Sequence, residues 1–98
     1  MARVLEFHPE AQDEFFAAID WYEAARPGLG AAFLSAVSEA AERALERPLA
    51  GAPLGSNLRR IFVRQFPYFV LYESDLSRVW VVAVAHFRRR PEYWKGRR

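Results

Sequence analysis

The sequence contains no cysteine and only two histidines among its 98 residues. Without cysteine, neither a disulfide framework nor a thiolate metal site can form, and the composition is compatible with the cytoplasm. His8 and His86 lie far apart in the sequence, and neither belongs to a run with the spacing of metal ligands, so the pattern does not favour a metal site. We therefore expect a protein that uses no metal and no other cofactor.

Long apolar runs are also missing. The most apolar stretch, residues 79–85, is far too short to span a bilayer and leads directly into arginines. The first residues show no apolar segment typical of a signal peptide, and no repeat, low-complexity tract or linker divides the chain. We expect a single domain over residues 1–98, located in the cytoplasm and without a membrane partner.

Aromatic residues and an uneven distribution of charge are the positive features of the composition. Three Trp, four Tyr and eight Phe exceed what the core of so short a chain needs. Residues 1–56 carry four Arg and nine Asp or Glu, a net charge of −5, whereas residues 57–98 carry ten Lys or Arg and three acids, a net charge of +7. This polarity favours an anionic partner, but it also arises when each half only solvates its own outer face.

The periodicity of apolar residues predicts an α+β fold with the order β-α-α-β-β-β. We expect strands over residues 3–7, 58–65, 68–73 and 78–87, one helix that starts at Pro9 and is broken by a turn over residues 26–30, and a second helix from about Leu29 to Glu46. Residues 48–56 read as a connecting loop. The sheet should be mainly antiparallel, with the two helices forming a hairpin packed on one face.

The last predicted strand is apolar on both faces. Strict alternation places Val79, Val81, Ala83, Ala85 and Phe87 on one face, and Trp80, Val82, Val84 and His86 on the other. Such a strand is normally covered on both sides, but two helices cover only one. The tail, a second copy or another protein should cover the other face. Trp21 and Trp80 lie outside the helix stripes, and we predict that they contact a partner.

The end of that strand is the most promising functional region. His86 and three consecutive arginines emerge from it, followed by Pro91, Tyr93 and Trp94. Because side chains alternate in an extended segment, we predict that Arg88 and Arg90 point to the same side as His86, and that Arg89 points away. Tyr93 and Trp94 are expected to hold the tail against the sheet.

Three blocks carry a resemblance to a known family: "FHPEAQDEFFAAIDWYE" at residues 7–23, "LRRIFVRQFPYFVLYE" at 58–73 and "VVAVAHFRRRPEYW" at 81–94. Together they resemble the RelE/ParE superfamily of toxins from type II toxin–antitoxin modules, particularly the ParE-like plasmid stabilisation branch. The resemblance covers nearly the whole chain. Its specific combination is Arg59, the Phe66-Pro67-Tyr68 turn, Tyr72 and the His86-Arg-Arg-Arg-Pro segment.

The resemblance implies a growth-inhibiting toxin neutralised by a cognate antitoxin, whose C-terminal segment wraps the toxin and whose N-terminal domain binds operator DNA. A homodimer or a heterotetramer with the antitoxin would be the corresponding assembly. The ParE branch poisons DNA gyrase by binding it, whereas RelE-like members cleave mRNA at the ribosome. A third alternative is a non-toxic relative that only binds the antitoxin.

Each alternative assigns different residues. Under the gyrase reading, the target-binding residues are Arg64, Arg88, Arg90 and Trp94. Under the nuclease reading, His86 would be the base, Arg59 and Arg88 would neutralise the phosphate, and Tyr93 would be an acid if its pKa were strongly depressed. His86 has a structural alternative as well, as a histidine satisfied beside an arginine.

Overall fold

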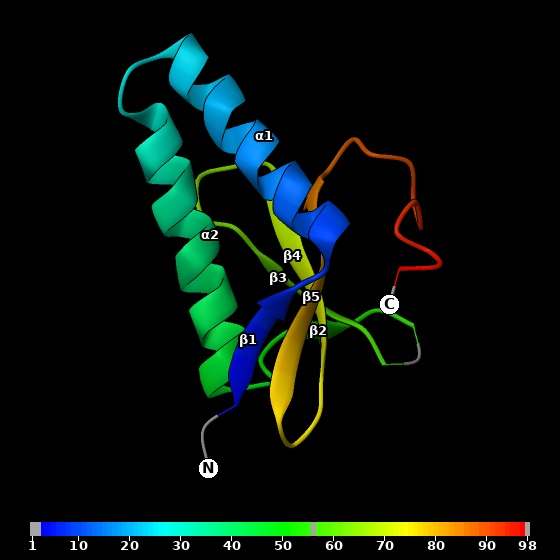
Figure 1. The fold of residues 1–98 in the computed structure, drawn as a ribbon. Coiled ribbons are helices and arrows are strands. Elements are labelled where there is room, and N and C mark those ends of the chain that lie inside the picture. Colours follow the sequence, from blue (N-terminus) through cyan, green and yellow to red (C-terminus); the bar gives the residue numbers. More distant parts are fainter. Residues whose placement is uncertain (1–2, 56, 98) are drawn as a thin grey trace.

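The computed structural model describes residues 3–55 and 57–97, and within them it confirms the α+β fold (Figure 1). Its elements follow one another as β1 (Val4–Phe7), α1 (Pro9–Ala25), α2 (Leu29–Glu46), β2 (Ala52–Pro53), β3 (Arg59–Phe62), β4 (Tyr68–Ser74) and β5 (Arg78–His86). The described strands form one sheet in the order β1-β5-β4-β3-β2. As predicted, β3, β4 and β5 run antiparallel to one another, while β1 pairs with β5 in parallel. Among the described residues, no helix is both long enough and apolar enough to cross a membrane.

The two helices form the predicted hairpin. Pro9 occupies the first turn of α1, and the His8 side chain caps this end by accepting a hydrogen bond from the Glu10 N–H (3.0 Å). Between the helices, Gly28 adopts φ 91°, and the Glu23 carboxylate accepts the N–H groups of Gly28 and Gly30. A Cβ atom at Gly30 would lie 2.8 Å from the Ile19 carbonyl oxygen, so glycine permits the close approach of the two helices.

The core lies between this hairpin and one face of the sheet. Its largest fully buried members are Tyr72 and Phe33, and Phe33 packs against the rings of Phe15, Tyr22, Phe66 and Tyr68. The burial of these aromatic rings away from water supplies most of the hydrophobic stabilisation of so small a domain. Many of the aromatic residues that the composition shows in excess therefore lie in this core.

A β-bulge in β5 changes the predicted direction of its side chains. Leu71 pairs with Ala83 but Tyr72 pairs with Val81, so Val82 is an extra residue on β5. Val79, Val81 and Val84 consequently face the helices, whereas Val82, Ala83 and Ala85 face the opposite side. The strict alternation predicted for residues 79–87 is wrong beyond Val82, because an extra residue shifts the period of two by one.

The chain between α2 and β4 also differs from its prediction. The strand expected over residues 58–65 ends at Phe62, because the chain turns through Gln65 (φ 68°) toward Pro67. Conversely, the predicted loop contains the two-residue strand β2, which pairs with Arg59 and Arg60; residue 56 of that loop lies outside the described residues. Tyr72 holds this connection in place: its hydroxyl donates to the Pro48 carbonyl and accepts from the Gly51 N–H, both at 2.9 Å.

Replacing Tyr72 by phenylalanine is expected to lower the free energy of unfolding by about 1–3 kcal/mol, because it leaves two backbone groups without their partner while keeping the ring. Chemical denaturation measures this loss. Tyr68→Phe, on the same strand, is the matched control and should cost less. Equal losses for the two variants would show that the Tyr72 hydroxyl does not anchor the connection.

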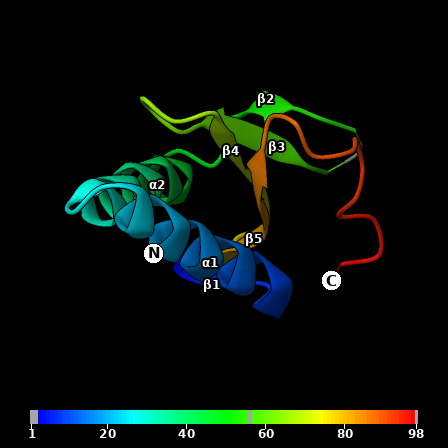
Figure 2. The same ribbon diagram turned by 90° about the horizontal axis from the view of Figure 1, so that it is seen from above.

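The C-terminal tail covers the second face of the sheet. In Figure 2 the helices lie on one side of the strands and the tail runs on the other. Tyr93 and Trp94 pack against the cluster formed by Phe69, Leu71, Val82, Ala83 and Ala85. The prediction that these two aromatic residues hold the tail against the sheet is confirmed. The tail is thus at least part of the cover that the two-sided apolar strand requires.

Candidate target-binding surface

Two segments distant in sequence meet at the end of the sheet where β5 stops. Tyr68 pairs with His86, and the Phe87 N–H donates to the Pro67 carbonyl (2.9 Å). This pairing places the turn between β3 and β4, which carries Arg64, at the same end as residues 88–90. The structure therefore brings together the elements that carry the arginines predicted to contact a target.

The arginine segment is a turn and not an extension of the strand. The Arg89 N–H donates to the His86 carbonyl and the Arg88 N–H to His86 Nδ1, each at 3.0 Å. The prediction that Arg88 and Arg90 share the direction of His86 relied on an extended chain, and this premise is wrong. All three arginines are exposed, and the Arg89 guanidinium lies 3.9 Å from the centre of the Tyr93 ring.

His86 lies on the helix-facing side of the sheet, because the bulge reverses its predicted direction. Its ring stands edge-on to Tyr68, with 5.0 Å between the centroids. Burial raises the pKa of Tyr68, with smaller contributions from Tyr22 and Glu14 that also raise it. His86 lines a groove of about 800 Å³ between α1 and the end of the sheet, together with Trp21, which is 67% exposed.

The four residues of the nuclease alternative do not converge. Arg59 pairs with Tyr72 and His86 with Tyr68, positions that are four residues and about 13 Å apart along β4. Moreover, the Arg59 guanidinium donates to the carbonyls of Gly51 (2.8 Å) and Leu49 (3.3 Å). Of the other three residues, only Arg88 contacts His86, and it does so through its backbone N–H. These four residues therefore do not form the acid–base set that the nuclease alternative requires, and the Arg59 guanidinium is engaged elsewhere.

Tyr93 is unsuited to the acid role that the nuclease alternative gives it. Burial raises its pKa far above the ordinary value, and the nearby Glu14 carboxylate raises it further. Proton transfer near neutrality would require the opposite shift. Its hydroxyl is buried without a well-formed hydrogen bond among the described residues, so Tyr93 acts here as a packing residue of the tail.

The tryptophans predicted to bind a target or a partner lie in different environments. Trp94 is half-buried against Phe69 (6.2 Å between ring centroids), so it holds the tail first of all. Trp80 is also half-buried, on the same side of the sheet as the tail, with the Arg78 guanidinium 4.6 Å from its ring centre. Trp21 lies on α1, across the sheet from Trp80. Trp21 and Trp80 therefore do not form one common surface.

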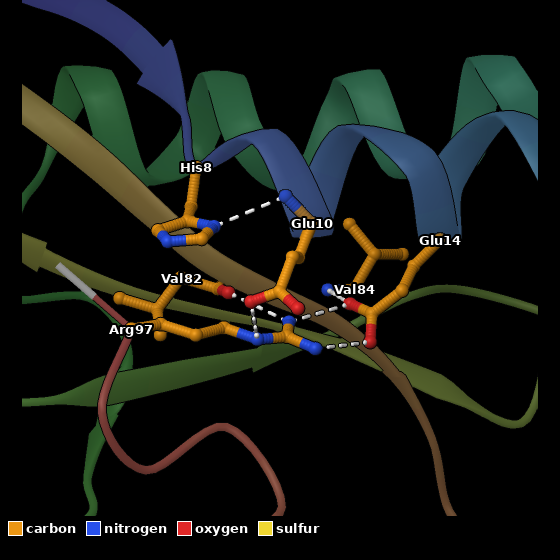
Figure 3. A network of polar contacts seen from close by, with 6 residues as sticks. All are labelled: His8, Glu10, Glu14, Val82, Val84 and Arg97. Carbon is orange, nitrogen blue, oxygen red and sulfur yellow. Dashed lines mark hydrogen bonds and ion pairs between the residues drawn. The ribbon is translucent and has the colours of Figure 1, made fainter.

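An ion pair near the C-terminus, which sequence reasoning missed, fixes the tail (Figure 3). Arg97 contacts both oxygens of the Glu14 carboxylate, at 3.0 and 2.9 Å, and donates to the Val82 carbonyl at 3.1 Å. Glu14 also accepts the Val84 N–H at 3.2 Å, and Glu10 lies 3.4 Å from Arg97. We call the set Glu14, Val82, Val84 and Arg97 the tail clamp.

The tail clamp lies along the edge of β5 that β1 does not reach. β1 ends at Phe7, opposite Val81, and beyond this point no strand of the described part of the chain pairs with β5 on that side. The two clamp side chains satisfy the backbone groups that β1 would otherwise reach. Both are largely buried, with side-chain exposures of 10% for Arg97 and 15% for Glu14. No local sequence signal reveals such a pair, because 83 positions separate its members.

The described residues contain no group of three or more His, Asp or Glu side chains positioned to hold a metal ion. The features that the surface does present are exposed arginines, aromatic rings and a groove beside α1.

Comparisons with known proteins agree with the fold and with the resemblance. A family model described as "ParE toxin of type II toxin-antitoxin system, parDE" matches residues 5–91. "Toxin ParE2" from two strains of Mycobacterium tuberculosis (CDC 1551 / Oshkosh and ATCC 25618 / H37Rv) is 33% identical over 95 residues, covering 93% of this chain and 88% of the relative. A solved structure, "Chromosomal ParDE TA system from P. aeruginosa", shares the fold at a TM-score of 0.73 and 13% identity, over 87% of this chain and 96% of that one. The chain belongs to the ParE toxin family of type II toxin–antitoxin systems.

Proposed function

We propose that this toxin acts in the cytoplasm, inhibits growth by binding DNA gyrase, and is neutralised by a cognate antitoxin. One observation carries the preference for binding over RNA cleavage. The exposed arginine turn is separated from Arg59, and Tyr93 is buried with a raised pKa, so the residues of the nuclease alternative do not form an acid–base set around His86. Binding through exposed cations needs no such set.

The target-binding surface consists of Arg64, Arg88 and Arg90 at the end of the sheet. Arg64 has 72% of its side chain exposed and forms a surface ion pair with Glu39 at 3.1 Å. Surface pairs of this kind contribute little to stability, so a target can replace Glu39 at small cost. Arg88 and Arg90 form no ion pair among the described residues and are available to an acidic surface. Trp94 contributes to this surface indirectly, because it holds the tail against the sheet.

The antitoxin contact is proposed for the groove beside α1. Trp21 presents an exposed aromatic side chain there, next to Tyr22, Tyr68 and Val84. Exposed aromatic residues at a groove are typical anchors for a segment that folds on binding. Trp80, on the other side of the sheet, would contribute only if the antitoxin continued around the edge formed by β1.

A supercoiling assay with purified components tests the proposal. The purified toxin is expected to inhibit DNA gyrase, and its induction without antitoxin should arrest replication and activate DNA damage signalling. Ribosome-dependent cleavage of mRNA by the same preparation, with gyrase unaffected, would contradict the proposal.

His86→Ala separates the two mechanisms within the same assay. If the toxin acts by binding, this variant should lose part of its inhibition of gyrase but not all of it, because the His86 ring lies on the helix-facing side and contacts the arginine turn only by accepting the Arg88 N–H at Nδ1 (3.0 Å). A nuclease would lose its base and with it its activity. The thermal midpoint of the variant, measured in parallel, shows whether any loss of inhibition follows from unfolding alone.

A further inference from the structure

We propose that the sheet face opposite the helices carries a binding site for single-stranded nucleic acid. The site is an aromatic and cationic patch formed by Arg60 and Phe62 of β3, Phe69 of β4, Phe87 after β5, and Trp94 of the tail. We call this set the aromatic patch. It lies next to the arginine turn and shares Trp94 with the proposed target-binding surface, but Arg60, Phe62, Phe69 and Phe87 belong to the aromatic patch alone.

Exposed rings are the first observation. Phe62, at the end of β3, is 52% exposed, and Phe87, just after β5, is 53% exposed. Their rings stand edge-on, 5.6 Å apart, and each lies 6.4 Å from the ring of Phe69. Phe69 is buried and packs on Trp94, so the two exposed rings rest on a rigid base. Two large aromatic side chains that lie side by side and are each about half exposed offer a platform for flat ligands.

Positive charge is the second observation. The Arg60 guanidinium lies 5.2 Å from the ring centre of Phe62 and 5.6 Å from that of Phe69, and it forms no ion pair among the described residues. Arg88 and Arg90 follow Phe87 directly and are exposed. A guanidinium already placed on aromatic rings can contact a phosphate without first losing much conformational freedom.

A groove of about 620 Å³ continues the aromatic patch along the tail. Arg60, Phe69, Phe87 and Trp94 line it, together with apolar Leu54 and Leu58. Two acids also line it, but Glu92 is paired with Lys95 at 3.0 Å, and Glu73 is engaged in other interactions. A strand that stacks bases on Phe62 and Phe87 could therefore continue into this groove without meeting an unpaired carboxylate there.

The combination of exposed aromatic rings and arginines favours single-stranded nucleic acid over other ligands. In a duplex the base faces are stacked on one another, so exposed rings gain nothing from them, whereas unpaired bases stack on aromatic side chains. An apolar peptide segment would use the rings but not the free guanidinium groups. Sheet faces with exposed aromatic residues flanked by cations are a known way of holding single strands. Stacking does not require a particular base, so we expect weak sequence preference.

Fluorescence anisotropy with the full-length toxin and labelled oligothymidylate or oligouridylate of about 12 nucleotides tests the proposal, a length within the usual site sizes. Binding is expected at low salt, with an affinity that falls as salt rises. The double variant Phe62→Leu/Phe87→Leu keeps apolar bulk but removes the rings, and should weaken binding at least about tenfold. Phe16→Leu removes a ring that is 51% exposed on α1, away from the aromatic patch, and should leave the affinity unchanged.

Three results would overturn the proposal: no binding at low salt, equal binding of the double variant and the wild type, or equal affinity for a duplex of the same length. Arg60→Gln should reduce the dependence on salt if its guanidinium meets a phosphate. Loss of gyrase inhibition by the double variant, with oligonucleotide binding intact, would assign the aromatic patch to a protein instead. Because the assay uses no gyrase, its outcome is separate from that of the proposed target.

Discussion

Arg97→Ala is expected to lower the free energy of unfolding by about 3 kcal/mol, a large part of the stability of a domain of this size. The substitution leaves the Glu14 carboxylate largely buried without its cation and leaves the Val82 carbonyl without its donor. Denaturant unfolding measures the loss.

Lys95→Ala provides the matched control within the tail. Lys95 is paired with Glu92 at 3.0 Å, but the two side chains are 75% and 55% exposed, so its loss should cost less than 1 kcal/mol. Hydrogen exchange at the Val84 amide gives a local readout, because Glu14 accepts that N–H in the tail clamp. Exchange there should accelerate in Arg97→Ala and not in Lys95→Ala. Equal unfolding free energies for the two variants would mean that the tail clamp does not hold the tail.

Periodicity was sufficient to predict the elements because each one buries a continuous stripe or face. The second helix was predicted from Leu29 to Glu46 and has these bounds, since Phe33, Val37 and Ala40 repeat at helical spacing and are fully buried. The order of elements and the antiparallel arrangement of the last three strands followed from the same patterns. The resemblance to ParE-like toxins, carried by three blocks, agrees with the family match.

Features that depend on one residue or on distant pairs were not predictable. The extra residue Val82 does not disturb an apolar run in which both faces are apolar, so alternation gave the wrong side for His86. The turn at residues 86–89 depends on His86 accepting the N–H of Arg88. The tail clamp joins the first helix to the end of the chain. All three lie at the candidate site, where the sequence identified the region but not its geometry.

Neutralising Arg88 and Arg90 together is expected to abolish growth inhibition while leaving the fold intact. Both side chains are exposed, and neither forms an ion pair among the described residues, so Arg88→Gln/Arg90→Gln should change the free energy of unfolding by less than about 1 kcal/mol. Charged contacts at the centre of an interface can each contribute several kcal/mol to binding. Loss of two of them would therefore weaken target binding by orders of magnitude, while binding of the antitoxin beside α1 should persist.

Arg26→Gln/Arg47→Gln is the matched control. It removes the same amount of charge from two exposed arginines at the C-terminal ends of α1 and α2, outside the proposed surface. Any effect of net charge on expression or solubility should appear in both double variants. A difference in toxicity between the two double variants would therefore report the loss of specific contacts made by Arg88 and Arg90.

Growth after induction without antitoxin, measured for the wild type and the two double variants at equal expression, tests the central claim most directly. We predict that the wild type and Arg26→Gln/Arg47→Gln stop growth, and that cells producing Arg88→Gln/Arg90→Gln grow like uninduced cells although the variant is folded. Full toxicity of Arg88→Gln/Arg90→Gln would contradict the claim that the end of β5 carries the target-binding surface.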